Sequence, residues 1–318
     1  MEKSWGRRLA AFAIVAVLLV VSFLAGYKTR DARGGPLRQA RAANDLLAPR
    51  LFVSNPNDSI VGFSKLRTEL EAYTNSLNTD VSLYFEYLPT GTSITTGDKH
   101  TFVAASLMKM PLAMNLMRLN ELGKLDLDRK VSIKKEWLNS EFGTLYQKGE
   151  GFSLTYREAL GYLLKDSDNT AAMLIQDTLA KNPLPEEEDS LYSIDVSVDL
   201  NSEKRASISA RSYSSVLKCL YFACYLNKAD SQELLTYLTQ SSFTDRLAAG
   251  LPSAVKVAHK IGTFSQETQS DCGIIYLERR NYSLCVMVDM ADPEGSKTIA
   301  YISKVVYDFV SSQTARSN

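Results

Sequence analysis

The sequence predicts a mixed α/β domain in which an antiparallel five-stranded sheet is covered by the first and last helices and flanked by an all-helical lobe. Strand-like alternation occurs near both ends of the globular part, the middle third shows helical periodicity, and an amphipathic helix closes the chain. Strands at both ends that enclose a helical middle indicate one sheet beside a separate group of helices. Active sites favour such a boundary between two lobes.

The N-terminal part of the domain predicts one helix followed by two strands. A helix is expected over 65–77, because its large apolar residues share one face: Leu66, Leu70, Tyr73 and Leu77. A strand is expected over 80–88, because apolar residues alternate along it: Val81, Leu83, Phe85 and Tyr87. The Pro-Thr-Gly turn at 89–91 leads into a second strand.

The middle third predicts a series of helices. A long helix is expected from about 105 to Leu122, ended by Gly123. A capping box formed by Thr155 and Glu158 opens the next helix. The remaining helices of this part are expected over 169–180, 210–226 and 231–240.

The C-terminal part returns to strands, which are expected over 254–260, 271–277 and 282–289. The chain then ends in an amphipathic helix around 299–310. With the two N-terminal strands, these three complete the five-stranded sheet.

The composition is that of a globular protein and excludes several functional classes. Of the 318 residues, 36 are basic and 36 acidic, so the formal net charge is zero. A protein that binds nucleic acid through its phosphates shows a basic excess, so nucleic acid is excluded as a partner. The two histidines, His100 and His259, and the four cysteines lack the paired spacing of a zinc site. No metal and no other cofactor is predicted.

The N-terminus carries a membrane signal. Residues 9–27 contain no charged side chain and, at 19 residues, are long enough to span a hydrocarbon core of about 30 Å. A cleaved signal peptide is the competing interpretation, but the apolar run is long and no small-x-small site follows it closely. We expect 1–28 to be a transmembrane anchor, 29–61 a linker, and 62–314 one globular domain.

The four cysteines leave the redox compartment open. Cys219 and Cys224 fall on one apolar helical stretch, where we expect buried free thiols. Cys272 and Cys285 flank the predicted hairpin between the last two strands, and their pairing stays open.

The first of three short motifs suited to nucleophilic catalysis pairs a serine with a lysine. Ser106 and Lys109 stand at i and i+3 near the start of the long helix, so a hydroxyl and an amine share one face. A serine needs an adjacent base, and a desolvated lysine is neutral enough to serve. The spacing alone is a weak signal, since it recurs at 132–135 and 215–218.

The other two motifs follow later in the chain. Ser167, Asp168 and Asn169 lie between two predicted helices, where these residue types also favour an ordinary N-cap. The stretch 260–263, Lys-Ile-Gly-Thr, ends an apolar strand, where a lysine before a turn is equally ordinary. Its Gly262 lets a substrate approach the backbone closely. The order of the three motifs and their placement at a helix start, a loop and a strand jointly indicate one site.

With these motifs, the sequence resembles the serine penicillin-recognising enzymes, most closely the catalytic domain of class A β-lactamases, whose signature is S-x-x-K, S-D-N and K-T-G. The resemblance runs from about 62 to 312, and further matching stretches are 102–111, 125–128, 167–172 and 257–262. It implies the β-lactamase/D,D-peptidase-like fold, with its helical lobe.

The resemblance also implies roles for individual residues. Ser106 would be the nucleophile and Lys109 its principal base. Ser167 would relay a proton to the leaving nitrogen, and Asn169 would orient Lys109 and hold the side-chain amide of the substrate.

The third motif would bind the substrate and its developing charge. Lys260 would supply positive potential near Ser167 and the substrate carboxylate, and Gly262 would let the substrate approach. The backbone N–H groups of Ser106 and Thr263 would form the oxyanion hole.

Two departures from the family pattern bear on the reaction. The family usually has Thr or Ser where this chain has Ile261, so recognition of the substrate carboxylate would fall to Thr263. The E-x-x-x-N stretch that supplies the deacylating glutamate of class A β-lactamases is missing. Asp195, with Asp199 four residues later, lies in about the right register, and we weigh it as a deacylating base. The acidic run 186–189 is expected to be a solvated loop, and for the stretch around Asp195 a polar extended segment is the preferred interpretation.

We therefore expect a membrane-anchored, extracytoplasmic serine enzyme that forms an acyl-serine with β-lactams or D-alanyl-D-alanine stem peptides of peptidoglycan. The positive-inside count opposes this orientation, because five basic residues follow the span and three precede it. Penicillin-binding, D,D-peptidase-like behaviour is preferred, because the deacylating glutamate is missing. A true β-lactamase, and a pseudoenzyme that binds cell-wall fragments without turnover, are the alternatives.

Overall fold

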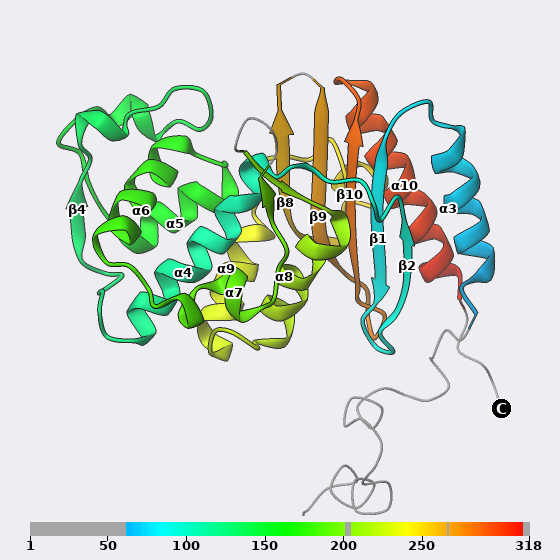
Figure 1. The fold of residues 1–318 in the computed structure, drawn as a ribbon, viewed down its shortest axis with the longest axis horizontal. Helices are drawn as coiled ribbons and strands as arrows, with labels where there is room; N and C mark the ends of the chain where they lie inside the picture. Colours follow the sequence, from blue (N-terminus) through cyan, green and yellow to red (C-terminus); the bar gives the residue numbers. More distant parts are fainter. Residues whose placement is uncertain (1–61, 201–204, 266, 314–318) are drawn as a thin grey trace, which may run out of the picture. The chain divides into compact units, whose positions relative to one another are not determined.

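The computed structural model describes residues 62–200, 205–265 and 267–313, which form a sheet with a helical lobe beside it (Figure 1). The predicted anchor at 1–28 and the predicted linker at 29–61 both lie outside these residues, so both stay predictions. No helix within the described ranges is long and apolar enough to cross a bilayer.

The sheet contains five antiparallel strands in the order β2-β1-β10-β9-β8. They are β1 Val81–Tyr87, β2 Thr92–Thr96, β8 Lys256–Phe264, β9 Thr268–Tyr276 and β10 Tyr282–Asp289. The two ends of the domain meet where β1 pairs with β10, from Val81 opposite Val288 to Tyr87 opposite Tyr282. The predicted five-stranded sheet is confirmed, and β2 and β8 are its two edge strands.

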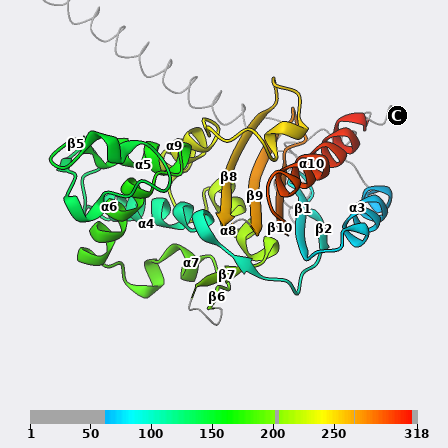
Figure 2. The same ribbon diagram turned by 90° about the horizontal axis from the view of Figure 1, so that it is seen from above.

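Helices cover both faces of this sheet (Figure 2). On one face lie the first and last helices of the domain, α3 Ser64–Ser76 and α10 Glu294–Ser312, as predicted. On the other face α8, Ala210–Phe222, contacts β1, β9 and β10. The helical lobe consists of α4 Lys109–Glu121, α5 Tyr156–Lys165, α6 Asn169–Lys181, α7 Ser190–Ser193 and α9 Lys228–Leu238. The capping box of Thr155 and Glu158 is present at the start of α5.

Short strands complete the architecture. β3 Phe102–Val103, β7 Ala206–Ile208 and β6 Asp199–Leu200 form a three-stranded sheet, and β4 Lys130–Ser132 pairs with β5 Ser153–Thr155. Because β3 immediately precedes Ser106, its pairing with β7 fixes the approach of the chain to that residue.

The alternation of side chains along the strands divides the interior into two cores. Leu83 and Phe85 of β1 pack with Leu66 of α3 and Ile302 of α10 on one face. Tyr84, between them in sequence, belongs to the core that the other face shares with α8 and the helical lobe. Replacing such a fully buried leucine with alanine typically costs about 2–5 kcal/mol of stability. The two cores therefore fix how the sheet and the lobe meet.

Three predicted elements differ in the structure. The long helix begins as a tight 3₁₀ turn over Ala105–Met108 before α4. The strand predicted over 254–260 continues to Phe264, so Lys260 lies within β8 and not at its end. The acidic run expected to be a solvated loop forms a 3₁₀ turn, Glu186–Glu188, tied to α4 by the bond from Arg118 Nε to Glu188 Oε2, 2.6 Å.

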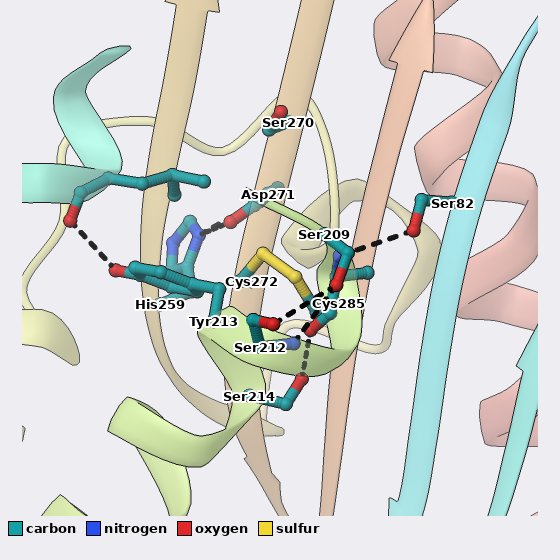
Figure 3. Close-up of a disulfide and its surroundings, with 12 residues drawn as sticks. Ser82, Ser209, Ser212, Tyr213, Ser214, His259, Ser270, Asp271, Cys272 and Cys285 are labelled. Carbon is teal, nitrogen blue, oxygen red and sulfur yellow. Dashed lines mark hydrogen bonds and ion pairs between the residues drawn. A yellow bond between two sulfur atoms is a disulfide. The ribbon is translucent and has the colours of Figure 1, made fainter. Parts of the chain in front are cut away.

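Both cysteine pairs form disulfides, which corrects the expectation of free thiols at Cys219 and Cys224. Ala223 adopts a left-handed conformation at the end of α8, and this turns the chain back so that Cys224 reaches Cys219. Cys272 and Cys285 are direct cross-strand partners in β9 and β10, and their disulfide lies close to α8 (Figure 3).

Candidate active site

Ser106 lies in the 3₁₀ turn that connects β3 to α4. A 3₁₀ turn has three residues per turn, so it places residues i and i+3 one above the other. Ser106 and Lys109 accordingly line the same cavity, as the S-x-x-K spacing predicts. Ala105, just before the serine, has φ +46°, a region that is costly for residues other than glycine. Such strain at one position beside a predicted nucleophile is typical of functional sites.

Tyr213 of α8 holds this turn by a hydrogen bond. Its fully buried hydroxyl donates to the Leu107 carbonyl at 3.1 Å (Figure 3). Burial raises the pKa of this phenol, so the group stays protonated and remains a donor. The turn that carries Ser106 is therefore fixed to the helix that crosses the sheet.

Lys109 is the first residue of α4, and its side chain is buried. Its ammonium nitrogen, Nζ, contacts the Ser167 carbonyl at 2.5 Å, Asn169 Oδ1 at 2.6 Å and Ser167 Oγ at 3.2 Å. Desolvation disfavours the charged amine and lowers the pKa of Lys109 to about 8, although Asp168 acts in the opposite direction. About a tenth of the Lys109 amines are then neutral at pH 7. Such an amine is suited to accept a proton from a serine.

Ser167 forms the turn between α5 and α6, where the sequence placed it. It is fully buried and has φ +53°, a left-handed conformation. The carbonyl of Tyr162 holds both sides of this turn, because it accepts from Asp166 N at 3.2 Å and from Asp168 N at 3.1 Å. The turn directs the hydroxyl of Ser167 toward the two lysines of the site.

Asp168 fixes the same turn from its other side. Its Oδ1 caps α6 by accepting from Ala171 N at 2.9 Å, and its Oδ2 accepts from Leu145 N at 2.8 Å. Gly143 passes so close that a Cβ there would lie 2.0 Å from Asp168 Oδ2. The N-cap explanation of this motif is therefore correct for Asp168, while Ser167 and Asn169 face Lys109.

Lys260 reaches the same turn from β8. Its side chain is only 1% exposed, and its Nζ contacts Ser167 Oγ at 2.9 Å and the Ile261 carbonyl at 3.2 Å. Burial is the largest cause of a pKa well below the usual lysine value, and the nearby charge of Lys109 lowers it further. Two amines thus converge on one hydroxyl.

The strand β8 then passes close to the nucleophile turn. A Cβ at Gly262 would lie 3.1 Å from the Ala104 carbonyl and 3.0 Å from a Leu107 side-chain carbon. Thr263 lines the cavity, whereas Ile261 is buried in the strand. Because β8 is an edge strand of the sheet, its outer edge is available to a substrate.

Arg246 also belongs to this site, although the sequence did not predict it. Although only 4% exposed, its guanidinium donates to the Gly262 carbonyl at 3.0 Å, Thr263 Oγ1 at 2.8 Å and Gln269 Oε1 at 2.6 Å. It places a permanent positive charge directly behind Thr263. It lies between α9 and β8 in a stretch without periodicity, so no local signal marked it.

The cavity at Ser106 has a volume of about 690 Å³. The described residues that line it come from four segments: Ala105, Ser106, Met108, Lys109 and Leu112; Asn139, Glu141 and Phe142; Asn169, Ala172, Met173 and Gln176; and Thr263, Phe264 and Ser265. Glu141 carries the only carboxylate among them. Ser167 and Lys260 lie behind this wall, where Ser167 contacts both Lys109 and Lys260.

Asp195 is not brought to this cavity. It lines a separate hollow beside α7 together with Glu186, Asp189 and Tyr192. Asp199 belongs to β6 and does not line the Ser106 cavity either. Among the described residues, Asp195 therefore does not share a cavity with Ser106, as a deacylating base would.

The two histidines take no part in the cavity. Nδ1 of His259 lies 2.9 Å from both carboxylate oxygens of Asp271, and this pair is buried within the sheet (Figure 3). His100 lies near Asp80 at the surface. Within the described ranges there is no group of three His, Cys, Asp or Glu residues that could hold a metal ion.

The chain is similar to known proteins in sequence and in fold. A sequence model described as the beta-lactamase enzyme family matches residues 65–310. A beta-lactamase of Bacteroides uniformis is 22% identical over 278 residues, which cover 77% of this chain and 91% of the relative. The extended-spectrum beta-lactamase PER-1 of Pseudomonas aeruginosa is 23% identical over 231 residues, covering 65% and 75%.

Solved structures show the same fold. PBP-A superimposes with a TM-score of 0.71 at 22% identity, over 79% of this chain and 97% of that one. A mutant of PBP-A, solved as an acyl-enzyme complex with penicillin-G, gives 0.70 at the same identity and coverage. The chain therefore belongs to the beta-lactamase enzyme family, and it is a serine hydrolase of that family with the fold that the sequence predicted.

Proposed function

We propose that this protein forms a covalent acyl-serine with β-lactams at Ser106 and hydrolyses the adduct slowly, as a penicillin-binding, D,D-peptidase-like enzyme. The observation that carries the proposal is the position of Ser167 Oγ, 2.9 Å from Lys260 Nζ and 3.2 Å from Lys109 Nζ. This joins all three sequence motifs in one proton-transfer network beside the serine turn. The relatives named beta-lactamases and the penicillin adduct of the PBP-A mutant support β-lactams as the substrate class.

The proposed acylation step uses Lys109 as the base, because it lines the same cavity as Ser106. Neutral Lys109 takes the proton of Ser106, the serine oxygen bonds to the carbonyl carbon, and the C–N bond of the lactam opens. The proton then passes from Lys109 through the Ser167 hydroxyl to the leaving nitrogen, so no charge remains separated. Because Lys260 donates to Ser167 Oγ, the hydrogen of that hydroxyl is free to be passed on.

Separate groups bind the carbonyl oxygen and the carboxylate of the substrate. The backbone N–H groups of Ser106 and Thr263 serve as the oxyanion hole, and each such donor is typically worth about 3 kcal/mol. The substrate carboxylate meets Thr263, with Arg246 directly behind it. The guanidinium thereby compensates for Ile261, which replaces the usual hydroxyl residue.

Slow deacylation is supported by the cavity wall, because neither Asp195 nor Asp199 lines it. Hydrolysis of the adduct needs a base that activates water, and among the described lining residues only Glu141 carries a carboxylate. Asp195 lies in another hollow. The natural substrate in this proposal is a D-alanyl-D-alanine stem peptide of peptidoglycan.

A true β-lactamase is the second candidate, and the names of the curated relatives favour it. It requires rapid hydrolysis of the acyl-serine, and Glu141 would be the base because it is the one carboxylate among the described lining residues. A binding protein without turnover, the third candidate, forms no covalent adduct at all.

The three candidates are separated by a pulse and chase with a fluorescent penicillin. The full-length protein in detergent is labelled, excess unlabelled penicillin is added, and the fluorescence of the protein band is followed on denaturing gels. We expect a label that persists for hours. Loss within seconds, with hydrolysis of the free drug, identifies a β-lactamase, and absence of label identifies the binding protein.

We also propose that residues 9–27 anchor the protein in the cell membrane with the catalytic domain outside the cytoplasm. The uncharged run of 19 residues supports the anchor, and the two disulfides support an oxidising compartment. Protease added to intact cells should then degrade the domain. A domain that stays protected until lysis contradicts this orientation and agrees with the positive-inside count.

A further inference from the structure

The cavity at Ser106 continues beyond the catalytic groups into a groove between α4 and α6. We propose that this groove binds a long, uncharged, apolar acyl arm on the substrate. The α4–α6 groove is defined by Met108, Leu112, Ala172, Met173 and Gln176. The inference rests on the proposed function, because the arm belongs to the substrate that acylates Ser106.

The helical spacing of the lining residues makes the groove continuous. From α6, the cavity is lined by Asn169, Ala172, Met173 and Gln176, at i, i+3, i+4 and i+7, which is one face of a helix. From the opposite side, Met108 at the end of the 3₁₀ turn and Leu112 of α4 lie four residues apart and flank Lys109. Both sets of residues line one cavity together with Lys109, and we infer that the α4–α6 groove runs between them.

The length of the α4–α6 groove follows from helix geometry. Seven residues separate Asn169 from Gln176, and a helix rises about 1.5 Å per residue, so the wall is about 10 Å long. An extended chain of about eight carbon atoms has the same reach, at roughly 1.25 Å per carbon. The arm that fills the groove is therefore longer than a methyl or phenyl group.

The groove has no charge with which to bind an ionic arm. Four of its five lining side chains are apolar, and two of these are methionines: Met108, Leu112, Ala172 and Met173. Methionine is flexible and polarizable, so it adapts to unbranched apolar chains. Met173 is 39% exposed in the free protein, and an apolar arm would remove this surface from water.

Asn169 connects the groove to the reaction centre. Its Oδ1 accepts from Lys109 at 2.6 Å, and its Nδ2 donates to Asn139 Oδ1 at 3.2 Å. In the proposed reaction, this amide holds the side-chain amide of the substrate. An acyl arm that continues past Asn169 then meets Ala172 and Met173 next, because they are the following residues on the same helical face.

The test compares two penicillins that differ only in the arm, one with a two-carbon acyl group and one with an unbranched eight-carbon acyl group. The second-order rate constant for acylation of the full-length protein is measured for each by intact mass spectrometry. We expect the eight-carbon penicillin to react at least about tenfold faster, since each buried methylene contributes favourably. In Met173→Gln this ratio should fall by about threefold or more.

Leu122→Gln is the matched control. Leu122 is 38% exposed and lies at the end of α4, outside the cavity, so its replacement should leave the ratio unchanged. Equal rates for the two arms, or the same loss of ratio in both variants, would overturn the proposal. Adducts with both penicillins but no preference contradict the groove alone, whereas absence of any adduct contradicts the proposed function.

Binding without chemistry keeps the groove testable in that last case. In Ser106→Ala, calorimetry should show tighter binding of the eight-carbon penicillin than of the two-carbon one. Equal affinity, or no binding of either, would overturn the proposed groove whatever the reaction proves to be.

Discussion

Lys260 Nζ lies 2.9 Å from Ser167 Oγ, although the two residues are 93 positions apart in the chain. The contact joins the edge strand β8 to the turn between α5 and α6. It closes the boundary between the sheet and the helical lobe at the place where Ser106 lies. In the proposed reaction, this contact leaves the hydrogen of Ser167 free to move to the leaving nitrogen.

Replacing Ser167 with alanine tests that relay. We expect acylation by penicillin to slow by about 10²- to 10⁴-fold, the usual contribution of a positioned proton-transfer group. The rate is measured by intact mass spectrometry, and a melting curve checks that the fold is retained. Ser283→Ala is the control, because Ser283 is also a buried serine, lies in β10 and should leave acylation unchanged. A Ser167→Ala protein that acylates at the normal rate would refute the relay.

The pH dependence of acylation tests the role of Lys109. Because burial lowers the pKa of this amine to about 8, the neutral base becomes more abundant as pH rises. The acylation rate should therefore rise between pH 6 and about 8 and level off above that. A rate that is flat across this range would contradict Lys109 as the base. Lys109→Met should remove the pH dependence together with most of the rate.

The same pKa predicts how stability depends on pH. Between about pH 8 and 10.5, the unfolded chain holds a proton on Lys109 that the folded protein has lost. At this residue the unfolded state then binds more protons, so the contribution of Lys109 to the free energy of unfolding should increase with pH in this window. Lys260, whose pKa is also lowered, acts in the same direction. Buried tyrosines, whose pKa values are raised, act in the opposite direction toward pH 10. Urea unfolding should therefore show the increase between pH 8 and about 9, and Lys109→Met should show less of it.

Asp168→Asn should destabilise the fold and misplace Ser167. The carboxylate accepts from Ala171 N and Leu145 N in a fully buried position. An amide presents one oxygen and one NH₂ group, so one of the two donors loses its partner, at a cost of about 1–3 kcal/mol. Denaturant unfolding measures this loss. Asp166→Asn, at the half-buried neighbouring position, should cost less than about 0.5 kcal/mol.

Asp195→Asn should leave the lifetime of the penicillin adduct unchanged. Asp195 lines a hollow beside α7 that is separate from the Ser106 cavity. A longer lifetime in this variant would identify Asp195 as the deacylating base, against the geometry described here. Glu141→Gln is the informative comparison, because it removes the one carboxylate among the described residues of the cavity wall.

Much of the fold could be predicted because its signals are local. The alternation along β1 and the apolar faces of α3 and α10 are visible in single segments, and they define the two cores. The order of three short motifs was enough to bring Ser106, Lys109 and Ser167 to one site. The 3₁₀ turn before α4 was not predicted, because the approach of β8 to Leu107 shapes it and lies far away in sequence.

The role of Arg246 and the Cys219–Cys224 disulfide could not be predicted from local sequence signals. Arg246 bonds to residues 16, 17 and 23 positions away, so its role appears only once β8 and β9 are paired beside it. Cys219 and Cys224 looked like two residues of one helix. Their disulfide depends on the left-handed Ala223, and alanine rarely adopts that conformation.

The central claim, that Ser106 is the nucleophile, is tested most directly by intact mass spectrometry of the full-length protein with a small excess of penicillin. The account predicts one adduct with the full mass of the penicillin, located by peptide mapping on the peptide that contains Ser106, and no adduct in Ser106→Ala. An adduct that forms unchanged in Ser106→Ala, or that maps to another peptide, would contradict it.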